Sequence, residues 1–229
     1  MSEALVCAQN PVCLVGGGEL SIKDLEDVER FAPTVVAADG GAAHVLASGR
    51  HPVAVIGDFD SLDDATRRRI PAERLHHIPE QESTDFDKAL RRISAPLVVG
   101  LGFLGARIDH QLAALNTLVR HADRACVLVG ALDVIIGLPP RLSLNLLPGT
   151  PVSIFPMAAV TGRSEGLQWP IDGLHFAPDG RSGTSNRATG PVTIEMHDPG
   201  AIGLFPRSTL EAVTRALLRA DATRWPARA

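Results

Sequence analysis

Short, continuous apolar runs recur through the first 137 residues of this chain, separated by turns and helix-like stretches. Continuous runs of this length suit strands that are buried on both faces, as in a parallel sheet. Strands that alternate with helices indicate an α/β layer structure. We therefore expect an α/β N-terminal domain with a mostly parallel sheet, with strands at 12–15, 34–38, 53–56, 97–101 and 126–129 and helices at 84–93 and 109–121.

The pattern changes after the Leu-Pro-Pro sequence at 138–140. At 142–146 and 192–196, apolar residues alternate with polar ones, which is the period-two pattern of a half-buried strand. Asp-Gly pairs at 172–173 and 179–180 supply turns. We predict a smaller all-β, sandwich-like C-terminal domain. The chain then divides into an α/β domain at 1–140, a β domain at 141–207 and a helical, basic tail at 208–229. We assign no function to the tail.

Composition excludes several classes of function. The formal net charge of −4 gives no general electrostatic reason to bind nucleic acid. No run approaches the roughly 20 apolar residues that cross a bilayer, and the N-terminus lacks the basic segment of a signal peptide. The 3 cysteines have no metal-binding spacing, and their small, odd number fits a reducing compartment. We expect a cytoplasmic protein without a nucleic-acid or membrane partner.

Carboxylates follow the predicted strands. Asp39 ends the second strand, Asp58 and Asp60 come directly after the third, Asp109 follows the fourth, and Asp85 opens a predicted helix. Carboxylates gathered at neighbouring strand ends repel one another unless a divalent cation neutralises them, and hard oxygen ligands suit Mg²⁺. Ligands of open α/β sheets also lie beyond the carboxyl ends of the strands. The first hypothesis is a metal-assisted site that handles a phosphorylated ligand.

Each motif also has a simpler structural interpretation. The Asp-Gly-Gly sequence at 39–41 could be a turn that caps the next helix, and Asp60 with Ser61 could cap the helix after them. Thr84 with Asp87 resembles a capping box. Three glycines at 16–18 could bring the backbone close to a phosphate or form an ordinary turn.

The later motifs leave alternatives of the same kind. Arg107 has the planar fork that suits triphosphate oxygens, and Asp109 could join the metal shell or act as a base. We expect His110 to be a structural residue in the first turn of a helix. Trp169 could stack on a flat heteroaromatic ring or belong to the core, and the Ser-Asn pair at 185–186 could form a turn.

Taken in order, the motifs resemble those of the thiamine pyrophosphokinase family. The resemblance covers residues 12–206 and rests on ADGG at 38–41, GDFDS at 57–61, STDFDKAL at 83–90, ARIDH at 106–110, ALNTL at 114–118, SEGLQW at 164–169 and TSN at 184–186. It implies an α/β catalytic domain followed by a β-sandwich. It also implies Mg²⁺-dependent transfer of the terminal diphosphate of ATP to the hydroxyl of thiamine, which gives thiamine diphosphate and AMP. The family resemblance further implies a homodimer with composite active sites that bind thiamine near the dimer interface.

The resemblance also assigns roles residue by residue. It implies catalytic roles for Asp58, Asp60, Asp85 and Asp109, metal binding by Asp58, Asp60 and Asp85, ATP binding by Asp39, Gly40, Gly41, Thr84, Lys88 and Arg107, and thiamine binding by Gln81, Trp169, Ser185 and Asn186. Catalysis would consist mainly of positioning and charge stabilisation, with Asp85 or Asp109 taking the hydroxyl proton.

Two residues depart from the family pattern. Ala43 stands where Asn is common, which removes one nucleotide-side hydrogen bond, and Ala106 replaces a frequent Gly.

Three other functions remain open: a pyrophosphokinase for another planar heterocycle such as a pterin, a ligand-binding regulator without turnover, and a nucleotide hydrolase. The products formed from ATP and thiamine distinguish these possibilities.

Overall fold

The computed structural model describes residues 4–105 and 107–227, and it divides into two compact units that we describe separately. Unit 1 comprises Met1–Ala114 and Leu128–Gly130, and unit 2 comprises Leu115–Val127 and Ala131–Ala229. Helix α5 (Ile108–Arg120) and strand β8 (Cys126–Val129) contribute residues to both units.

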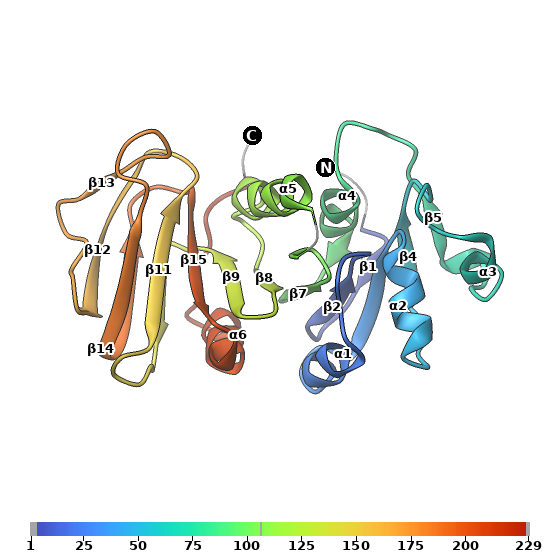
Figure 1. Ribbon diagram of the computed structural model, residues 1–229, viewed down its shortest axis with the longest axis horizontal. Helices are drawn as coiled ribbons and strands as arrows, with labels where there is room; N and C mark the ends of the chain where they lie inside the picture. The colour runs from blue at the N-terminus through green and yellow to red at the C-terminus, as the bar shows by residue number, and fades with distance from the viewer. Residues whose placement is uncertain (1–3, 106, 228–229) are drawn as a thin grey trace. The chain divides into compact units, whose positions relative to one another are not determined.

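Parallel strand pairs form the centre of unit 1 (Figure 1). The strands pair in the order β7 (Val98–Leu101), β2 (Val12–Val15), β3 (Thr34–Ala38), β4 (Ala54–Gly57) and β5 (Leu75–His77). Nearly every residue of β2, β3, β4 and β7 is buried, as their continuous apolar sequences predict. A separate two-stranded parallel sheet pairs β1 (Val6–Cys7) with β6 (Ile93–Ser94).

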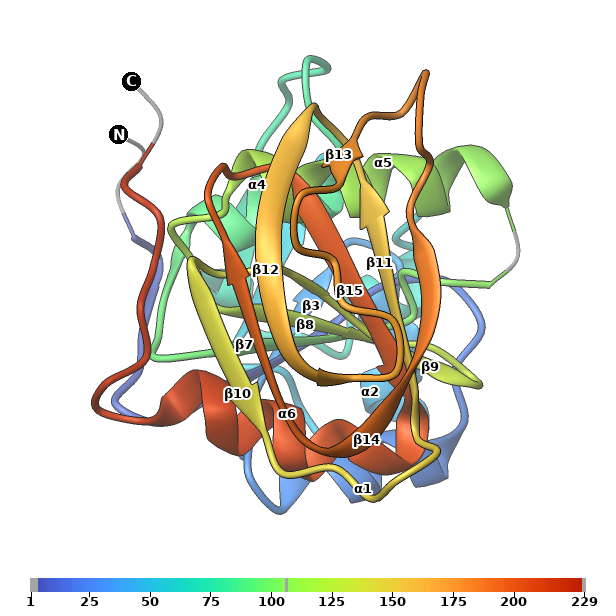
Figure 2. The same cartoon turned by 90° about the vertical axis from the view of Figure 1, so that its left-hand side faces the viewer.

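Helices cover both faces of these strands. Helices α1 (Ile22–Glu29) and α2 (Gly41–Ala47) lie on one side, and α4 (Asp85–Arg91) lies on the other (Figures 1 and 2). A short helix α3 (Asp64–Arg67) and a 3-10 turn (Ala72–Arg74) lead into β5. The helices bury apolar side chains, among them Leu25 of α1 and Val45 of α2.

Unit 2 is built from antiparallel pairs around the long strand β14 (Thr184–Met196) (Figure 2). Its partners are β10 (Arg141–Leu144), β11 (Pro151–Pro156) and β12 (Val160–Leu167). Strand β12 also pairs with β13 (His175–Phe176). Strand β15 (Ala201–Pro206) pairs with β11 and with β9 (Asp133–Gly137). Buried and exposed residues alternate along β10 and β14, which confirms the predicted strand at 192–196 and, of the one at 142–146, the part up to Leu144.

The predicted fold class is wrong. The strands do not separate into a parallel sheet of an α/β domain and an independent sandwich, because one mixed, 13-stranded sheet contains them in the order β13-β12-β14-β11-β15-β9-β8-β7-β2-β3-β4-β5, with β10 beside β14. The apolar runs showed which residues form buried strands, but they carry no information about which strands are neighbours. Strand β9 lies next to β8 in this order, and no strand was predicted at 133–137.

The last part of the chain packs on unit 2. A 3-10 turn (Arg207–Thr209) precedes helix α6 (Leu210–Leu218), which contacts β10. Beyond the helix, the indole Nε1 of Trp225 donates to the carbonyl of Leu138 at 2.8 Å, and the N–H of Arg141 donates to Oγ1 of Thr223 at 3.1 Å. The described part of the predicted tail is therefore tied to the strands of this unit. Across the described residues, no helix is both long and apolar enough to span a membrane.

Candidate active site

Strand register brings the predicted motifs of unit 1 to one edge of the sheet. Val15 pairs with both Ala37 and Leu101, and Ala38 pairs with Ile56, so that β2, β3, β4 and β7 end at nearly the same level. The residues that follow these strands therefore emerge together at the carboxyl edge, where ligands of such sheets bind.

A cavity of about 680 Å³ opens at this edge, within the range of small-molecule sites. All of its lining residues belong to unit 1. They include glycines from three loops, at 16–18, 40 and 102–105, together with residues that follow β4, open α4 and open α5. The cavity lining contains the predicted residues Asp39, Gly40, Asp58, Asp60, Gln81, Thr84, Asp85, Lys88 and Arg107.

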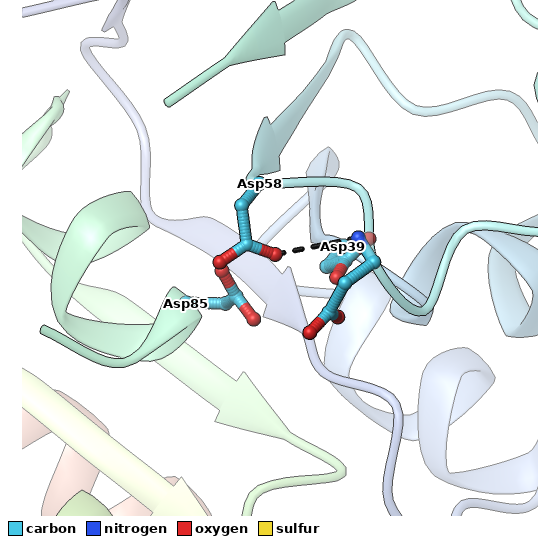
Figure 3. Close-up of side chains that lie close together, drawn as sticks. Asp39, Asp58 and Asp85 are labelled. Atoms are coloured by element: carbon cyan, nitrogen blue, oxygen red, sulfur yellow. Dashed lines mark hydrogen bonds between the residues drawn. The ribbon is translucent and has the colours of Figure 1, made fainter. Parts of the chain in front are cut away.

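Four carboxylates converge at the cavity: Asp39, Asp58, Asp60 and Asp85 each offer an oxygen, and these oxygens lie within 4.8 Å of one another. The carboxyl groups of Asp58 and Asp85 lie side by side in Figure 3. Asp39 is buried, and Asp60 is exposed. Asp39 was predicted to lie on the nucleotide side, and the structure brings its carboxylate next to those of the predicted metal ligands.

Asp39 has an uncommon backbone conformation, a carboxylate oxygen without a hydrogen-bond partner among the described residues, and a raised pKa. Its backbone has φ of 44°, in the left-handed region that a non-glycine residue rarely adopts. Its Oδ2 accepts a hydrogen bond from the N–H of Ser61 at 3.2 Å, whereas its buried Oδ1 has no hydrogen-bond partner among the described residues. Burial, together with the neighbouring carboxyls of Asp60 and Asp85, raises the pKa of Asp39 from 3.8 to about 7. A buried, unpartnered carboxylate oxygen beside other carboxylates fits a cation.

The loop after β4 is also strained. Phe59, between the two carboxylates, has φ of 66°, and its ring lies 5.4 Å from the ring of His77 and 5.7 Å from the guanidinium of Arg67. The N–H of Asp60 turns back to Oδ1 of Asp58 at 3.3 Å. These contacts hold a conformation that costs roughly 1–3 kcal/mol in isolation, and such strain clusters at functional sites.

The Asp-Gly pair does form the turn that precedes α2, with Gly40 as the N-cap residue, but no side chain of these two motifs caps α2 or α3. Helix α3 is capped by Asp63, whose side chain accepts from the N–H of Thr66 at 2.9 Å, so neither Asp60 nor Ser61 is the cap. Helix α2 begins after Gly40, with no side-chain cap. In α4, by contrast, Thr84 is the N-cap, because its Oγ1 accepts from the N–H of Asp87 at 3.3 Å.

Lys88 lies among the carboxylates. Its Nζ is 2.6 Å from Oδ2 of Asp58 and 3.2 Å from Oδ1 of Asp85. Burial raises the pKa of Asp85 above its usual range, and the ammonium of Lys88 offsets only part of this effect. Burial also acts to raise the pKa of Asp58, but hydrogen bonds from Lys88, the N–H of Asp60 and Gln81 bring it below its usual range.

The loop before α4 is anchored by Glu80, which the sequence analysis missed. The carboxylate of Glu80 accepts from the N–H of Ser83 at 3.1 Å and from Nη2 of Arg91 at 2.8 Å. Arg91 in turn reaches the buried Asp87 at 3.0 Å. This arrangement places Nε2 of Gln81 at 3.1 Å from Oδ2 of Asp58. No sequence signal marked Glu80, because its partner Arg91 lies in a helix that begins only after the loop.

Arg107 and Asp109 form an exposed ion pair at 2.6 Å. Arg107 lines the cavity, while Asp109 lies outside the group of four carboxylates. The guanidinium of Arg107 lowers the pKa of Asp109 to about 2, which makes Asp109 a poor proton acceptor. His110 also lines the cavity, although we had expected a purely structural residue. The neighbouring Ala106 lies outside the described residues.

The residues predicted to bind thiamine are divided between the units. Gln81 lines the cavity of unit 1, whereas Trp169, Ser185 and Asn186 belong to unit 2. The N–H of Trp169 donates to Oδ1 of Asn186 at 3.1 Å, and Nδ2 of Asn186 donates to the carbonyl of Trp169 at 2.6 Å. Asn186 is buried, but the Trp169 side chain is 52% exposed. Ser185 and Asn186 lie in β14 rather than in a turn.

Several residues that line the cavity are marked only weakly, or not at all, as functional residues in the sequence. Glycines 16–18 were ambiguous in the sequence, yet a Cβ on Gly18 would lie 2.7 Å from the carbonyl of Gly102, so the two loops pack backbone to backbone. Phe103 also lines the cavity, and its ring packs against that of Phe86 at a tilt of 42°, with the ring centroids 4.5 Å apart. His44 also lines the cavity, next to the unusual Ala43. These residues become neighbours only through the sheet register.

A glycine-lined cavity with converging carboxylates at the carboxyl edge of parallel strands is typical of proteins that handle phosphorylated ligands with a divalent cation. The family model for the thiamin pyrophosphokinase catalytic domain matches residues 25–129. This stretch of the chain is thus similar to the thiamin pyrophosphokinase catalytic domain, and the relatives and solved structures described next carry the same name.

Among curated relatives, thiamine pyrophosphokinase of Bacillus subtilis (strain 168) is 32% identical over 113 residues, which cover 47% of this chain and 53% of the relative. Thiamine pyrophosphokinase 1 of Oryza sativa subsp. japonica is 26% identical over 198 residues, which cover 69% of this chain and 75% of the relative. The chain thus matches about half the length of the first relative and three quarters of the second.

The fold is shared with solved structures. Thiamin pyrophosphokinase from Geobacillus thermodenitrificans superposes with a TM-score of 0.70 at 23% identity, over 88% of this chain and 99% of the other. The enzyme from Candida albicans gives a TM-score of 0.72 at 15% identity, over 89% of this chain and 93% of the other.

Proposed function

We propose that this protein is a thiamine pyrophosphokinase, which transfers a diphosphate group from ATP to the hydroxyl of thiamine and thereby makes thiamine diphosphate and AMP. The observation that carries the proposal is the convergence of four carboxylates on a glycine-lined cavity, with one buried carboxylate oxygen that lacks a partner among the described residues. The similarity to thiamine pyrophosphokinases indicates the substrates, and the cavity holds groups that the proposed reaction can use.

The carboxylates fit Mg²⁺. Asp58, Asp60 and Asp85 provide the hard oxygen ligands that this ion prefers, and the unpartnered Oδ1 of Asp39 adds another. When bound, Mg²⁺ would offset the charge of the triphosphate. Without such an ion, the four carboxylates repel one another, which favours the protonated state of Asp39.

The nucleotide would occupy the glycine-lined part of the cavity. Gly40 lines this part of the cavity beside Asp39, where a Cβ would lie only 3.1 Å from the carbonyl of Ser61, whereas Gly41 packs against the backbone of Val15. Thr84 and Lys88 line the same cavity, and Arg107 presents a planar guanidinium that suits phosphate oxygens. These are the residues that we propose to hold ATP.

The transfer step is a direct displacement. The hydroxyl oxygen of thiamine forms a bond to the β-phosphorus, the bond between this phosphorus and the oxygen bridging to the α-phosphorus breaks, and AMP leaves with that oxygen. Catalysis is mainly positioning and charge stabilisation. Of the two carboxylates that could take the hydroxyl proton, we favour Asp85, because it lies in the cavity among the converging carboxylates, whereas Asp109 lies outside that group and the guanidinium of Arg107 lowers its pKa to about 2. Asp109 would instead orient Arg107.

We propose that Gln81, Trp169, Ser185 and Asn186 bind thiamine. The exposed Trp169 ring offers a flat apolar face for a heteroaromatic ring, and Asn186 fixes its backbone. Residues 1–140 would then bind ATP and the cation, and residues 141–207 would bind thiamine, in a homodimer whose active sites combine residues of both subunits. The three free cysteines fit a reducing cytoplasm.

The test is an assay with Mg²⁺, ATP and thiamine that separates AMP from ADP and detects thiamine diphosphate. Equal amounts of AMP and thiamine diphosphate support the proposal. Transfer to a hydroxymethyl pterin instead would change the substrate, and release of orthophosphate or pyrophosphate without an acceptor would indicate a hydrolase. Thiamine binding without any product would indicate a regulator.

A further inference from the structure

Lys88 is one of only two lysines in the sequence, and its side chain is 1% exposed. A buried ammonium is strongly unfavourable unless it is paired and hydrogen-bonded. Here the pairing is with Asp58 at 2.6 Å and Asp85 at 3.2 Å, two of the four carboxylates that converge on the cavity. The ammonium therefore directly contacts two members of the carboxylate cluster.

The two partners of Lys88 come from different elements. Asp58 directly follows β4, and Asp85 is the first residue of α4, the helix that also carries Lys88. The lysine thus ties the helix to the end of the strand through the groups that face the cavity. Gln81 adds a second donor to the same Oδ2 of Asp58, at 3.1 Å. Each of the two carboxylates has one oxygen committed to a nitrogen donor even without a metal ion.

We propose that Lys88 takes the place of a second cation in this cluster. Its single positive charge offsets one of the four carboxylates, and its hydrogen bonds hold Asp58 and Asp85 in position, so that one divalent ion completes the site before the nucleotide binds. Lys88 is then a positioning residue for the carboxylates in addition to the ATP-binding role proposed above. This inference rests on the cation site of the proposed function, but not on the identity of the acceptor.

The test is Lys88→Met in the full chain, which keeps the length and apolar stem of the side chain and removes its charge. The control is Lys23→Met, because Lys23 is the other lysine and forms an exposed i,i+4 pair with Asp27. Bound Mn²⁺ is counted by electron paramagnetic resonance without nucleotide, and melting temperatures are measured with EDTA and with Mn²⁺.

We expect wild type and Lys23→Met to bind one Mn²⁺ ion, and Lys88→Met to bind two. With EDTA, Lys88→Met melts roughly 10 °C below wild type, since a buried ion pair has lost one partner, and Mn²⁺ restores most of the difference. One bound ion in Lys88→Met, or an unchanged melting temperature with EDTA, overturns the proposal. If wild type itself binds no Mn²⁺, the cation site of the proposed function fails instead.

If Lys88→Met does not fold, the double variant Lys88→Met/Asp85→Asn decides the question. Removing one carboxylate together with the ammonium leaves the net charge of the cluster unchanged. The double variant therefore folds if the lost charge is what prevents Lys88→Met from folding. A double variant that stays unfolded shows that packing of the lysine stem is the reason, and this result also overturns the proposal.

Discussion

The backbone N–H of Ser61 donates a hydrogen bond to Oδ2 of Asp39 at 3.2 Å, which ties the loop after β4 to the end of β3. The other oxygen of Asp39 is buried without a partner among the described residues, and the backbone at Asp39 is strained. A strained residue with an unpaired buried oxygen persists in a fold where ligand binding or catalysis requires it. In the metal-free protein, Asp39 therefore combines a strained backbone with a buried carboxylate oxygen that lacks a partner among the described residues.

Asp39 gives the metal-free protein a pH-dependent stability. Its folded-state pKa of about 7 lies above the ordinary 3.8, so the folded protein holds this proton more tightly than the unfolded chain does. The resulting stabilisation is complete below pH 4 and is lost as the pH rises through 7, by on the order of 3 kcal/mol. Urea denaturation between pH 4 and 8 in EDTA measures this loss.

Asp39→Asn should flatten that pH dependence, because the amide does not titrate and still accepts a hydrogen bond from Ser61. Mg²⁺ should flatten it in the wild type, since the cation favours the ionised carboxylate. If the slope in EDTA is equally steep in wild type and Asp39→Asn, another group is responsible.

Asp60→Ala should abolish transfer, with a loss of at least ~100-fold in kcat, because the cation loses one of its ligands. The fold should stay intact, and the metal-free protein should gain roughly 0.5 kcal/mol since one like charge is removed. Asp64→Ala is the control, as Asp64 is exposed in the first turn of α3 and outside the cluster. Steady-state kinetics and thermal melts provide both readouts, and wild-type turnover in Asp60→Ala would remove this residue from the mechanism.

Glu80→Ala should raise KM for thiamine about tenfold with little effect on ATP binding. The carboxylate holds the loop that presents Gln81 to Asp58, so its loss releases Gln81 without touching the glycine-lined part of the cavity. Glu82→Ala, at an exposed position in the same loop, is the control. A larger change in the KM for ATP than in that for thiamine would show that the loop serves the nucleotide.

Trp169→Ala should raise KM for thiamine with the melting temperature nearly unchanged, because the side chain is 52% exposed while the backbone hydrogen bonds to Asn186 remain. Leu147→Ala, also in unit 2 and 79% exposed, controls for loss of surface apolar area. If only the KM for ATP changes, Trp169 does not bind thiamine.

Gly41→Ala should destabilise the protein by at least ~2 kcal/mol, because the new Cβ would lie 2.0 Å from the carbonyl oxygen of Val15. Gly180→Ala is the matched control, since the nearest atom to its Cβ would be 3.6 Å away. Chemical denaturation of both variants gives the comparison. Equal stability would mean that β2 and α2 can separate without loss.

The sequence indicated local features well and pairings poorly. Asp58 and Asp60 were found because a buried strand, β4, ends directly before them, and Thr84 was found because a capping residue leaves a local signature. The single mixed sheet was missed because strand neighbours are set by contacts between distant segments, such as the pairing of β15 with β9. The position of Lys88 between Asp58 and Asp85 was missed for the same reason: Asp58 is 30 residues away in sequence.

The most direct test of the proposed function follows the β-phosphorus of ATP. With [β-³²P]ATP, thiamine and Mg²⁺, the account predicts that the label appears in thiamine diphosphate, together with an equal amount of unlabelled AMP. Label retained in ADP, or released as pyrophosphate while thiamine is unchanged, would contradict it.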